Sequence, residues 1–430
     1  MKSARPCVAA SLAAALLTAM LTPLAQAQTY KEKVLYSFTG GTNGANPLAG
    51  LIFDSSGNLY GTANDDDYNC GTVFKLTPEP KGRWEQSVLH AFTCGKDGGW
   101  PFTGLIFDSK GNLYGSTSYG GNLNCGGNGA GCGVVFELTP TSHGNWQEKV
   151  LYAFNDHADG GYPNGLTIDS HGNLYGTTSE GGHLDSCSPY GGCGVAFKLT
   201  RGSKGGWKES VIHTFSGGRD GATPGDSVIF DSRGNAYGTT TYGGDTSNQN
   251  CVVYNHLGCG VVFRLTHGGN GKWTEKILYT FRGSTDESFP SGLIFDERGN
   301  LYGPISQAVF ELTPTSIGPW KKKVIHAFKD SEDGSGPHDL IFDSAGNLYS
   351  TTIYGGDLNC FDGYGCGVVF ELTPASNGNW MEKVLYAFKG GGADGEAPRA
   401  GLVMDSTGGL YGTTEWGGLC DCGVVFKVTP

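Results

Sequence analysis

Aromatic and acidic side chains recur at one position of a segment that repeats along the chain, directly before a Gly-Gly pair. The residues there are Tyr119, Glu180, Tyr242, Tyr354 and Trp416, and Asp65 is their counterpart in the first copy. Aromatic rings can stack on sugar rings, and carboxylates accept hydrogen bonds from hydroxyls. Trp100 and Tyr162, in a second loop series, would extend this surface. We predict that the six residues before the Gly-Gly position form a ligand-binding row, which we call the rung. The alternative is that the aromatic residues only cover neighbouring loops.

Two of these carboxylates are candidates for acid–base chemistry. Asp65 and Glu180 lie on either side of Tyr119 in repeat order, and hydrolysis of a glycosidic bond needs two carboxyl groups roughly 5–10 Å apart. Positions spread over three repeats are too distant for that. The chain also has no Gly-x-Ser-x-Gly elbow and no His-Glu-x-x-His segment. We therefore predict no catalytic residue and no cofactor. The alternative is a carboxylate-dependent polysaccharide hydrolase or lyase, or a lactonase-like enzyme.

The cysteines predict disulfides. Twelve follow Cys7, an even number that suits an exported protein. Four loops hold two cysteines each, whereas Cys70 lacks a loop partner and is paired with Cys94, beyond the next strand. The predicted pairs are Cys70–Cys94, Cys125–Cys132, Cys187–Cys193, Cys251–Cys259, Cys360–Cys366 and, with a strained Cys-x-Cys spacing, Cys420–Cys422. Pairs on separate repeats lack the spacing of a four-ligand zinc site, so we predict no metal.

Acidic residues recur at two further positions of the repeat, and histidines at a third. We predict structural roles for all three sets. Asp-x-x-Gly-Asn turns, as at Asp54, recur in every repeat, and one carboxylate per repeat does not form a calcium cage. Asx-Gly-x-x-Pro segments, as at Asp97 and Asp159, are interpreted as Asx turns, with Asp286 as a variant. His90, His213 and His326 stand where the other copies of the Lys-Val-Leu-Tyr-x-Phe segment have tyrosine. We expect these histidines to contribute to packing.

The elements that must position these residues are short strands. Gly-Leu-Ile-Phe-Asp, Leu-Tyr-Gly-Thr-Thr, Gly-Val-Val-Phe-x-Leu-Thr-Pro and Lys-Val-Leu-Tyr-x-Phe, or close variants, each occur seven times. They are rich in β-branched and aromatic residues and bounded by Gly, Asp, Asn or Pro, which is typical of strands. Four strands per repeat of 47 to 65 residues predict an all-β, seven-bladed β-propeller with four antiparallel strands in each blade.

The phase of the repeat predicts how the ring closes. Residues 33–38, the first strand after the predicted signal peptide, match the fourth strand of the repeat. The last strand of the chain, which ends at Pro430, matches the third strand of the repeat. We expect the N-terminal strand to pair with the last blade, which removes exposed sheet edges. In each antiparallel blade, the loop before the first strand and the loop after the second strand would then emerge on the same face of the ring. These loops are the longer and more variable ones, so we place binding there.

The repeated segments resemble the GloVer tandem repeat of "choice-of-anchor" bacterial surface proteins. The resemblance covers the whole chain after the first 27 residues, and all seven copies fit. It implies a freely secreted or periplasmic protein, because members often carry a C-terminal anchoring segment where this chain stops on a strand. The resemblance implies no activity and carries over no site residues.

The ends and the charge limit the localisation and the partners. Lys2 and Arg5, an apolar run to Leu24 and Ala25-Gln26-Ala27 predict a signal peptide over 1–27 and a single propeller domain over 28–430. The net charge of −12 falls to about −14 without the two basic residues, which disfavours nucleic acid and anionic membranes. We expect a monomer in the cell envelope or exterior, not inserted in a membrane, whose partner is a glycan or an envelope protein.

Overall fold

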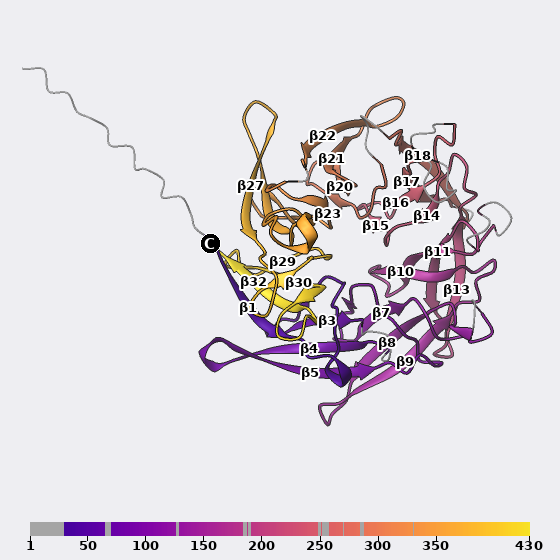
Figure 1. The fold of residues 1–430 in the computed structure, drawn as a ribbon. Helices are drawn as coiled ribbons and strands as arrows, with labels where there is room; N and C mark the ends of the chain where they lie inside the picture. The colour runs from indigo at the N-terminus through magenta and orange to yellow at the C-terminus, as the bar shows by residue number, and fades with distance from the viewer. Residues whose placement is uncertain are drawn as a thin grey trace, which may run out of the picture.

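A computed structural model describes residues 30–64, 70–125, 129–183, 187, 191–247, 251, 258–269, 271–283, 288–329 and 331–430. Within these ranges the structure consists of strands with three short 3-10 turns and contains no α-helix. No described helix is long or apolar enough to cross a membrane. The strands form seven four-stranded antiparallel sheets arranged in a ring, as predicted (Figure 1).

The first three blades take the strands in chain order. Blade 1 contains β2 (Ile52–Phe53), β3 (Leu59–Ala63), β4 (Thr72–Glu79) and β5 (Arg83–Ala91). Blade 2 contains β6 (Ile106–Phe107), β7 (Leu113–Thr117), β8 (Val134–Pro140) and β9 (Trp146–Ala153). Blade 3 contains β10 (Gly161–Ile168), β11 (Leu174–Glu180), β12 (Val195–Arg201) and β13 (Trp207–Thr214). Short 3-10 turns η1 (Gly41–Asn43) and η2 (Pro80–Gly82) lie in loops.

In blades 4 and 6 the first strand is split into two pieces. Blade 4 contains β14 (Ala222–Pro224), β15 (Ile229–Phe230), β16 (Ala236–Tyr242), β17 (Val261–His267) and β18 (Trp273–Thr280). Blade 5 contains β19 (Ile294–Phe295), β20 (Leu301–Ile305), β21 (Ala308–Thr313) and β22 (Lys321–Ala327). Blade 6 contains β23 (Ser335–Pro337), β24 (Ile341–Phe342), β25 (Leu348–Tyr354), η6 (Phe361–Gly363), β26 (Val368–Pro374) and β27 (Trp380–Ala387).

Blade 7 closes the ring with strands from both ends of the described chain. It contains β29 (Val403–Met404), β30 (Leu410–Thr414), β32 (Val424–Thr429) and the N-terminal β1 (Lys31–Ser37), with the small pair β28 (Gly395–Glu396) and β31 (Trp416–Gly417). Lys31 pairs with Thr429 and Ser37 with Val424. Figure 1 shows the C-terminus beside β1. The predicted closure is confirmed, and β32 has a partner on each side.

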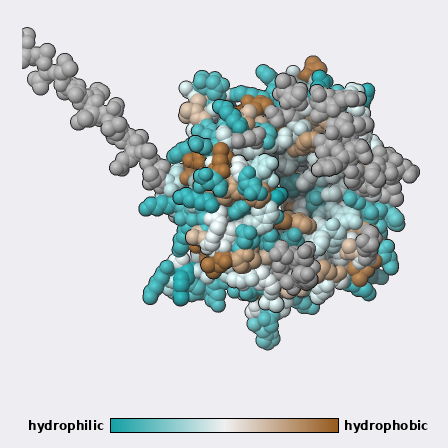
Figure 2. Space-filling model, in the orientation of Figure 1, coloured by the Kyte–Doolittle hydropathy of each residue, from teal (hydrophilic) through white to brown (hydrophobic). Residues whose placement is uncertain are grey.

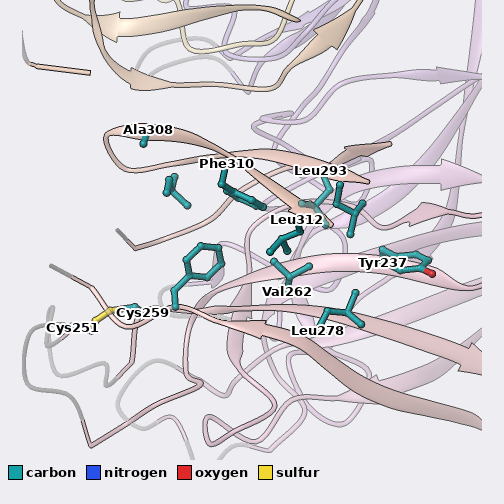
Figure 3. Packing of buried hydrophobic residues seen from close by; sticks show 12 residues of the cluster. Tyr237, Cys251, Cys259, Val262, Leu278, Leu293, Ala308, Phe310 and Leu312 are labelled. Atoms are coloured by element: carbon teal, nitrogen blue, oxygen red, sulfur yellow. A yellow bond between two sulfur atoms is a disulfide. The ribbon is translucent and has the colours of Figure 1, made fainter. Parts of the chain in front are cut away.

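The core lies between neighbouring blades and is built around phenylalanines. Phe263 of β17 and Phe310 of β21 are fully buried, and Phe310 meets Phe281 edge to face at 5.4 Å. Figure 3 shows Phe310 and Leu312 of one blade among Val262 and Leu278 of the previous one. Sheets that each bury both faces in this way hold their loops in fixed relative positions, which any site at the blade ends requires.

The glycine of each Leu-Tyr-Gly segment makes this packing possible. A methyl group on Gly238 would lie 2.6 Å from the tip of the Phe263 ring, and Gly115 is placed in the same way against Phe136. A side chain here would therefore crowd the phenylalanine ring, although blade 6 accommodates Ser350 opposite Phe370 without loss of the strand pairing. The repeated glycine favours this packing and has no direct role at the surface.

Candidate functional site

The described rung residues lie where the second strands end, as predicted, on the face that carries the long loops. Glu180, Tyr242 and Tyr354 are the last residues of β11, β16 and β25, and Trp416 begins β31. Tyr119 bridges to Gly99 in the loop before strand β6. All five side chains are partly buried. Asp65, the sixth predicted member, lies outside the described residues.

The loops that precede the first strands are fastened to the previous blade. The amides of Trp100 and Tyr162 donate to the carbonyl oxygens of Cys70 and Cys132, over 2.8 and 2.9 Å. Both residues have positive φ, 58° and 56°, which is rare for aromatic residues and marks local strain. Phe289 repeats the arrangement, with φ 58° and a 3.1 Å bond to Cys259. The fastening fixes where these aromatic side chains stand.

Three aromatic side chains meet at the junction of blades 2 and 3. Trp100 and Tyr119 pack edge to face with 4.6 Å between ring centroids, and Tyr119 meets Tyr162 in the same way at 5.5 Å. All three remain partly accessible. Together with the carboxylates described next, Asp156 and Glu180, they are called the aromatic–acid site.

The carboxylates of Asp156 and Glu180 converge beside these rings. Gly161 pairs with Glu180 across the blade, which brings the Asp156 loop alongside β11. A methyl group placed on Gly191 would lie 2.5 Å from Glu180 Oε2 and 3.4 Å from Asp156 Oδ2. Among the described residues, the buried Oδ1 of Asp156 has no hydrogen-bond partner.

Burial and mutual repulsion change the acidity of this pair. Burial and then the charge of Asp156 raise the pKa of Glu180 to about 7. Burial also raises the pKa of Asp156 to about 6, and Asp159 adds to the effect while His157 opposes it. Burial and the two nearby carboxylates raise the pKa of Tyr162 to about 12. The site therefore offers both a proton donor and a proton acceptor near neutral pH, and groups that hydrogen-bond hydroxyls in either form.

The remaining rung members form two other groups. Tyr242 packs on Phe289, 5.6 Å between centroids. In blades 6 and 7, Phe361 lies between Tyr354 and Trp416 and stacks on Trp416 at 5.1 Å with 18° between planes. The Arg399 guanidinium lies 5.8 Å from the Trp416 centroid. The rung is thus three separate clusters, and the stacking surface of Trp416 is shared with Phe361.

Sequence reasoning missed Asp156, and a weak signal for it exists. Asp156 holds the repeat position of Cys94, and both residues have φ of 56°. Cys94 is bonded to Cys70 at the previous blade, whereas Asp156 lies against the Cys125–Cys132 disulfide. The enzyme hypothesis named Asp65 and Glu180; the structure brings Glu180 together with Asp156, and Asp65 lies outside the described residues.

Two carboxylates inside the ring were also missed. A methyl group on Gly292 of blade 5 would lie 2.4 Å from Asp339 Oδ1 of blade 6 and 2.8 Å from Asp226 Oδ2 of blade 4. Contacts among three blades place the pair on the inner wall of the ring. The surrounding wall of the ring and the charge of Asp339 raise the pKa of Asp226, and the same wall raises the pKa of Asp339, although Asp339 is exposed to solvent. Both occupy positions that are uncharged in other copies, Asn164 and Gly165 for example.

The cysteines form the six disulfides that were predicted. They are Cys70–Cys94, Cys125–Cys132, Cys187–Cys193, Cys251–Cys259, Cys360–Cys366 and Cys420–Cys422. Four of them close loops on the face that carries the rung, and Figure 3 shows Cys251–Cys259 beside its cluster. They restrict the loops around the candidate site.

The turn aspartates bind the chain itself. Asp169 accepts hydrogen bonds from the amides of His171 and Asn173, the Asn173 side chain and the Tyr175 hydroxyl. These four bonds lower the pKa of Asp169 despite partial burial. The same pattern is repeated at Asp54 and Asp108, so these carboxylates stabilise turns, as expected.

The histidines and the aspartates of the Asx-Gly-x-x-Pro segments meet at the blade junctions. His90 lies 3.4 Å from Asp97 and packs on Phe92 at 4.7 Å, in the packing role expected. Asp286 lies outside the described residues. One such junction gathers three groups that could bind a metal, because His213 Nε2 lies 3.3 Å from Glu275 and 3.7 Å from Asp220. The other candidate groups include cysteines that are already bonded to each other.

Comparison with known proteins adds the family and the fold. The model of the Gloeobacter/Verrucomicrobia repeat matches residues 21–188 and 304–430. No curated protein sequence matches the chain. Among solved structures, virginiamycin B lyase from Staphylococcus aureus is 16% identical with a TM-score of 0.53, over 94% of this chain and 99% of that chain.

An extracellular domain of a larger bacterial protein shows the same fold. The extracellular domain of BT4673, described as a one component system of B. thetaiotaomicron, is 12% identical with a TM-score of 0.52. The similarity covers 91% of this chain but 40% of that chain. Identities this low establish the propeller fold and no shared activity. On the family match and the seven repeats together, the chain belongs to the Gloeobacter/Verrucomicrobia repeat family.

Proposed function

We propose that this protein is a secreted, non-catalytic binding protein that recognises glycans through the aromatic–acid site. One observation carries the proposal: Trp100, Tyr119 and Tyr162 gather at a blade junction beside two convergent carboxylates. Aromatic rings supply apolar faces for sugar rings, while Asp156 and Glu180 would accept hydrogen bonds from hydroxyls. Disulfide-restricted loops keep the site ordered before binding, which lowers the entropic cost of association.

The six disulfides support the proposed localisation, because such bonds persist in oxidising compartments outside the cytoplasm. Residues 1–27 would act as the signal peptide, with the propeller following as a monomer. The described part of the face in Figure 2 is mostly hydrophilic with small hydrophobic patches, as expected for a surface exposed to water. The acidic charge favours neutral glycans over anionic ones.

The test is binding of the oxidised chain from Gln28 to an array of glycans and polysaccharides, with Trp100→Ala and Trp416→Ala as matched variants. We expect saturable binding by the wild type and by Trp416→Ala, and its loss in Trp100→Ala. Binding lost only in Trp416→Ala would move the site to blades 6 and 7 and contradict the proposal. An array without binding would refute glycan recognition and favour an envelope protein as partner.

A second function, hydrolysis or lysis of a polysaccharide, is favoured by the raised pKa values of Glu180 and Asp156. One protonated and one ionised carboxyl group are what acid–base catalysis on a glycoside uses. Glu180→Gln separates the two functions. A binding protein would retain glycan affinity within a few-fold, whereas an enzyme would bind and release no product. Product release by the wild type, lost in this variant, would replace the binding proposal.

A further inference from the structure

Two pockets on the opposite face are copies of each other. One lies between blades 2 and 3, with Tyr114 and Trp207 in its wall, and has a cavity of about 360 Å³. The other lies between blades 5 and 6, with Tyr302 and Trp380, and has about 430 Å³. Their linings occupy the same repeat positions throughout. They are called the 2/3 pocket and the 5/6 pocket, and neither includes the aromatic–acid site.

An arginine of the chain itself lines the 2/3 pocket. Arg201 donates to Glu137 over 3.1 Å, and its guanidinium lies 5.3 Å from the centroid of Trp207. Glu137 also accepts a 2.7 Å hydrogen bond from the Tyr114 hydroxyl. The arginine leaves Glu137 only 5% exposed. Aromatic ring and carboxylate together thus bind one guanidinium, by cation–π attraction and a charged hydrogen bond.

At the 5/6 pocket the same groups are present without that arginine: Tyr302 and Trp380 line it, and Glu311 lies behind Tyr302. Tyr302 donates to Glu311 over 3.0 Å and packs on Trp380 and Phe342 at 5.9 and 5.2 Å. Pro374 occupies the repeat position of Arg201: each is paired, in the strand register, with the tryptophan of its pocket. Glu311 is more exposed than Glu137. Among the described residues, no basic side chain forms a salt bridge with Glu311.

The other charged groups do not remove the difference between the pockets. The lysines opposite the two glutamates, Lys149 and Lys323, both donate to a glycine carbonyl of the next blade. Each pocket also has one exposed basic residue on its turn, Lys110 or Arg298. The 5/6 pocket gains an acidic residue, Glu297, where the 2/3 pocket has serine. It is therefore the more negative of the two.

Other blades place a cation beside the equivalent tyrosine. Lys75, Lys198 and Lys427 lie 5.7, 5.1 and 4.6 Å from the tyrosine ring of their blade. They stand at the repeat position where blades 2 and 5 have Glu137 and Glu311. A basic residue occupies this place in four blades, whereas blades 2, 5 and 6 have Glu137, Glu311 and Glu371. In blade 2, Arg201 supplies a positive charge across the blade junction.

We propose that the 5/6 pocket binds the guanidinium group of an arginine side chain presented by a partner protein. The planar group would lie against Trp380 and donate to Glu311, in the place that Arg201 takes in the 2/3 pocket. A guanidinium fits better than an ammonium group because it combines a flat face for the indole with several donors in one plane. The inference is independent of the glycan proposal, since it concerns the other face.

The experiment uses the full oxidised chain labelled with 5-fluorotryptophan and observed by 19F NMR, with Trp380→Phe and Trp207→Phe assigning two resonances. The probe is acetyl-arginine amide, and acetyl-citrulline amide is its neutral analogue. We expect a saturable shift of the Trp380 resonance, with affinity at least about tenfold weaker for the citrulline probe. The Trp207 resonance should not respond. An arginine flanked by other residues in a short peptide should bind more tightly than the free amide.

Two reciprocal variants test the structural reasoning. Pro374→Arg should place an arginine in the 5/6 pocket and abolish the Trp380 response, while Arg201→Ala should open the 2/3 pocket and make the Trp207 resonance respond. Both positions are exposed strand ends, so the fold should tolerate the changes. An unchanged Trp380 resonance in the wild type, equal response to the citrulline probe, or a response that survives in Pro374→Arg would each overturn the proposal.

Discussion

The junctions between blades contain acidic residues that should make the protein more stable in mild acid than in mild base. Five glutamates occupy the same place on the outer strands, namely Glu32, Glu148, Glu209, Glu275 and Glu382. Burial, and then a nearby aspartate in most of them, raises the pKa of each to about 7. At Glu209 the aspartate is Asp159 of the previous blade. Each glutamate also has a buried oxygen without a hydrogen-bond partner among the described residues.

Replacing Glu209 by glutamine removes this titration. The folded-state pKa lies above the unfolded one, so protonation favours the folded state; the stabilisation is complete below about pH 4.5 and is lost as the pH rises through about 7. The difference corresponds to at most about 3 kcal/mol for one residue. We expect Glu209→Gln to be about 1–3 kcal/mol more stable than the wild type at pH 8, and within about 1 kcal/mol of it at pH 5.

The assay is urea denaturation of both proteins at pH 5 and pH 8, followed by tryptophan fluorescence and circular dichroism. The exposed Glu85→Gln is the control and should change stability equally little at both pH values. Blade 1 shows that the fold accepts glutamine here, because Gln86 donates to the Asn43 carbonyl over 3.0 Å. A Glu209→Gln variant that is less stable than the wild type at pH 8, or equally altered at both pH values, would refute the reasoning.

Three further outcomes follow from the fold. Cys70–Cys94 closes a longer loop, with a sequence separation of 24, than Cys125–Cys132, with 7, so it should stabilise the protein more. In urea titrations, replacing both cysteines by Ala should lower the free energy of unfolding by about 3 kcal/mol for Cys70–Cys94 and about 2 kcal/mol for Cys125–Cys132. The reverse order would contradict this dependence on loop length. Deletion of residues 30–38 removes β1 and should expose the edge of β32, so light scattering should detect aggregates. Adding residues 30–38 as a peptide should reduce the aggregation. A monomeric product that unfolds cooperatively would show that closure is dispensable. Asp169→Ala should cost about 2–3 kcal/mol in thermal unfolding through four lost hydrogen bonds, whereas an effect below about 0.5 kcal/mol would show that the turn forms without them.

The ring was predictable because every copy of the repeat has to satisfy the same packing. Gly238 and Phe263 are adjacent through one strand pairing, and their counterparts repeat that contact in other blades. Loop cysteines could be paired for a similar reason, since a short loop brings its own ends together. The splitting of the first strand in blades 4 and 6 was not predicted, and the positive φ of Thr223 and Gly336 does not explain it, because Tyr162 has a positive φ inside the continuous β10.

The candidate site was predicted only in part because its groups come from different blades. Tyr119 and Glu180 were identified from one repeat position, but Tyr119 meets Trp100 within its own blade and Tyr162 across the junction. The proximity of Asp156 to Glu180 depends on a residue with φ of 56°. No spacing in the sequence specifies how such a loop turns, so the carboxylate pair could not be deduced from composition.

Reversals of charge at an otherwise regular position are the signal that sequence reasoning could have used. The residue after the phenylalanine of each third strand is basic in four blades and glutamate in three, among them Glu137 and Glu311. A tyrosine that already contacts a turn aspartate then faces a second carboxylate, and one hydroxyl proton cannot satisfy both. Arg201 supplies the missing positive charge at Glu137. Most blades have proline at the position of Arg201. The arginine therefore neutralises Glu137, whereas the prolines at its position, Pro374 and Pro430, leave Glu311 and Glu371 without that partner. The charge of Glu311 is the one that we assign to another molecule to neutralise.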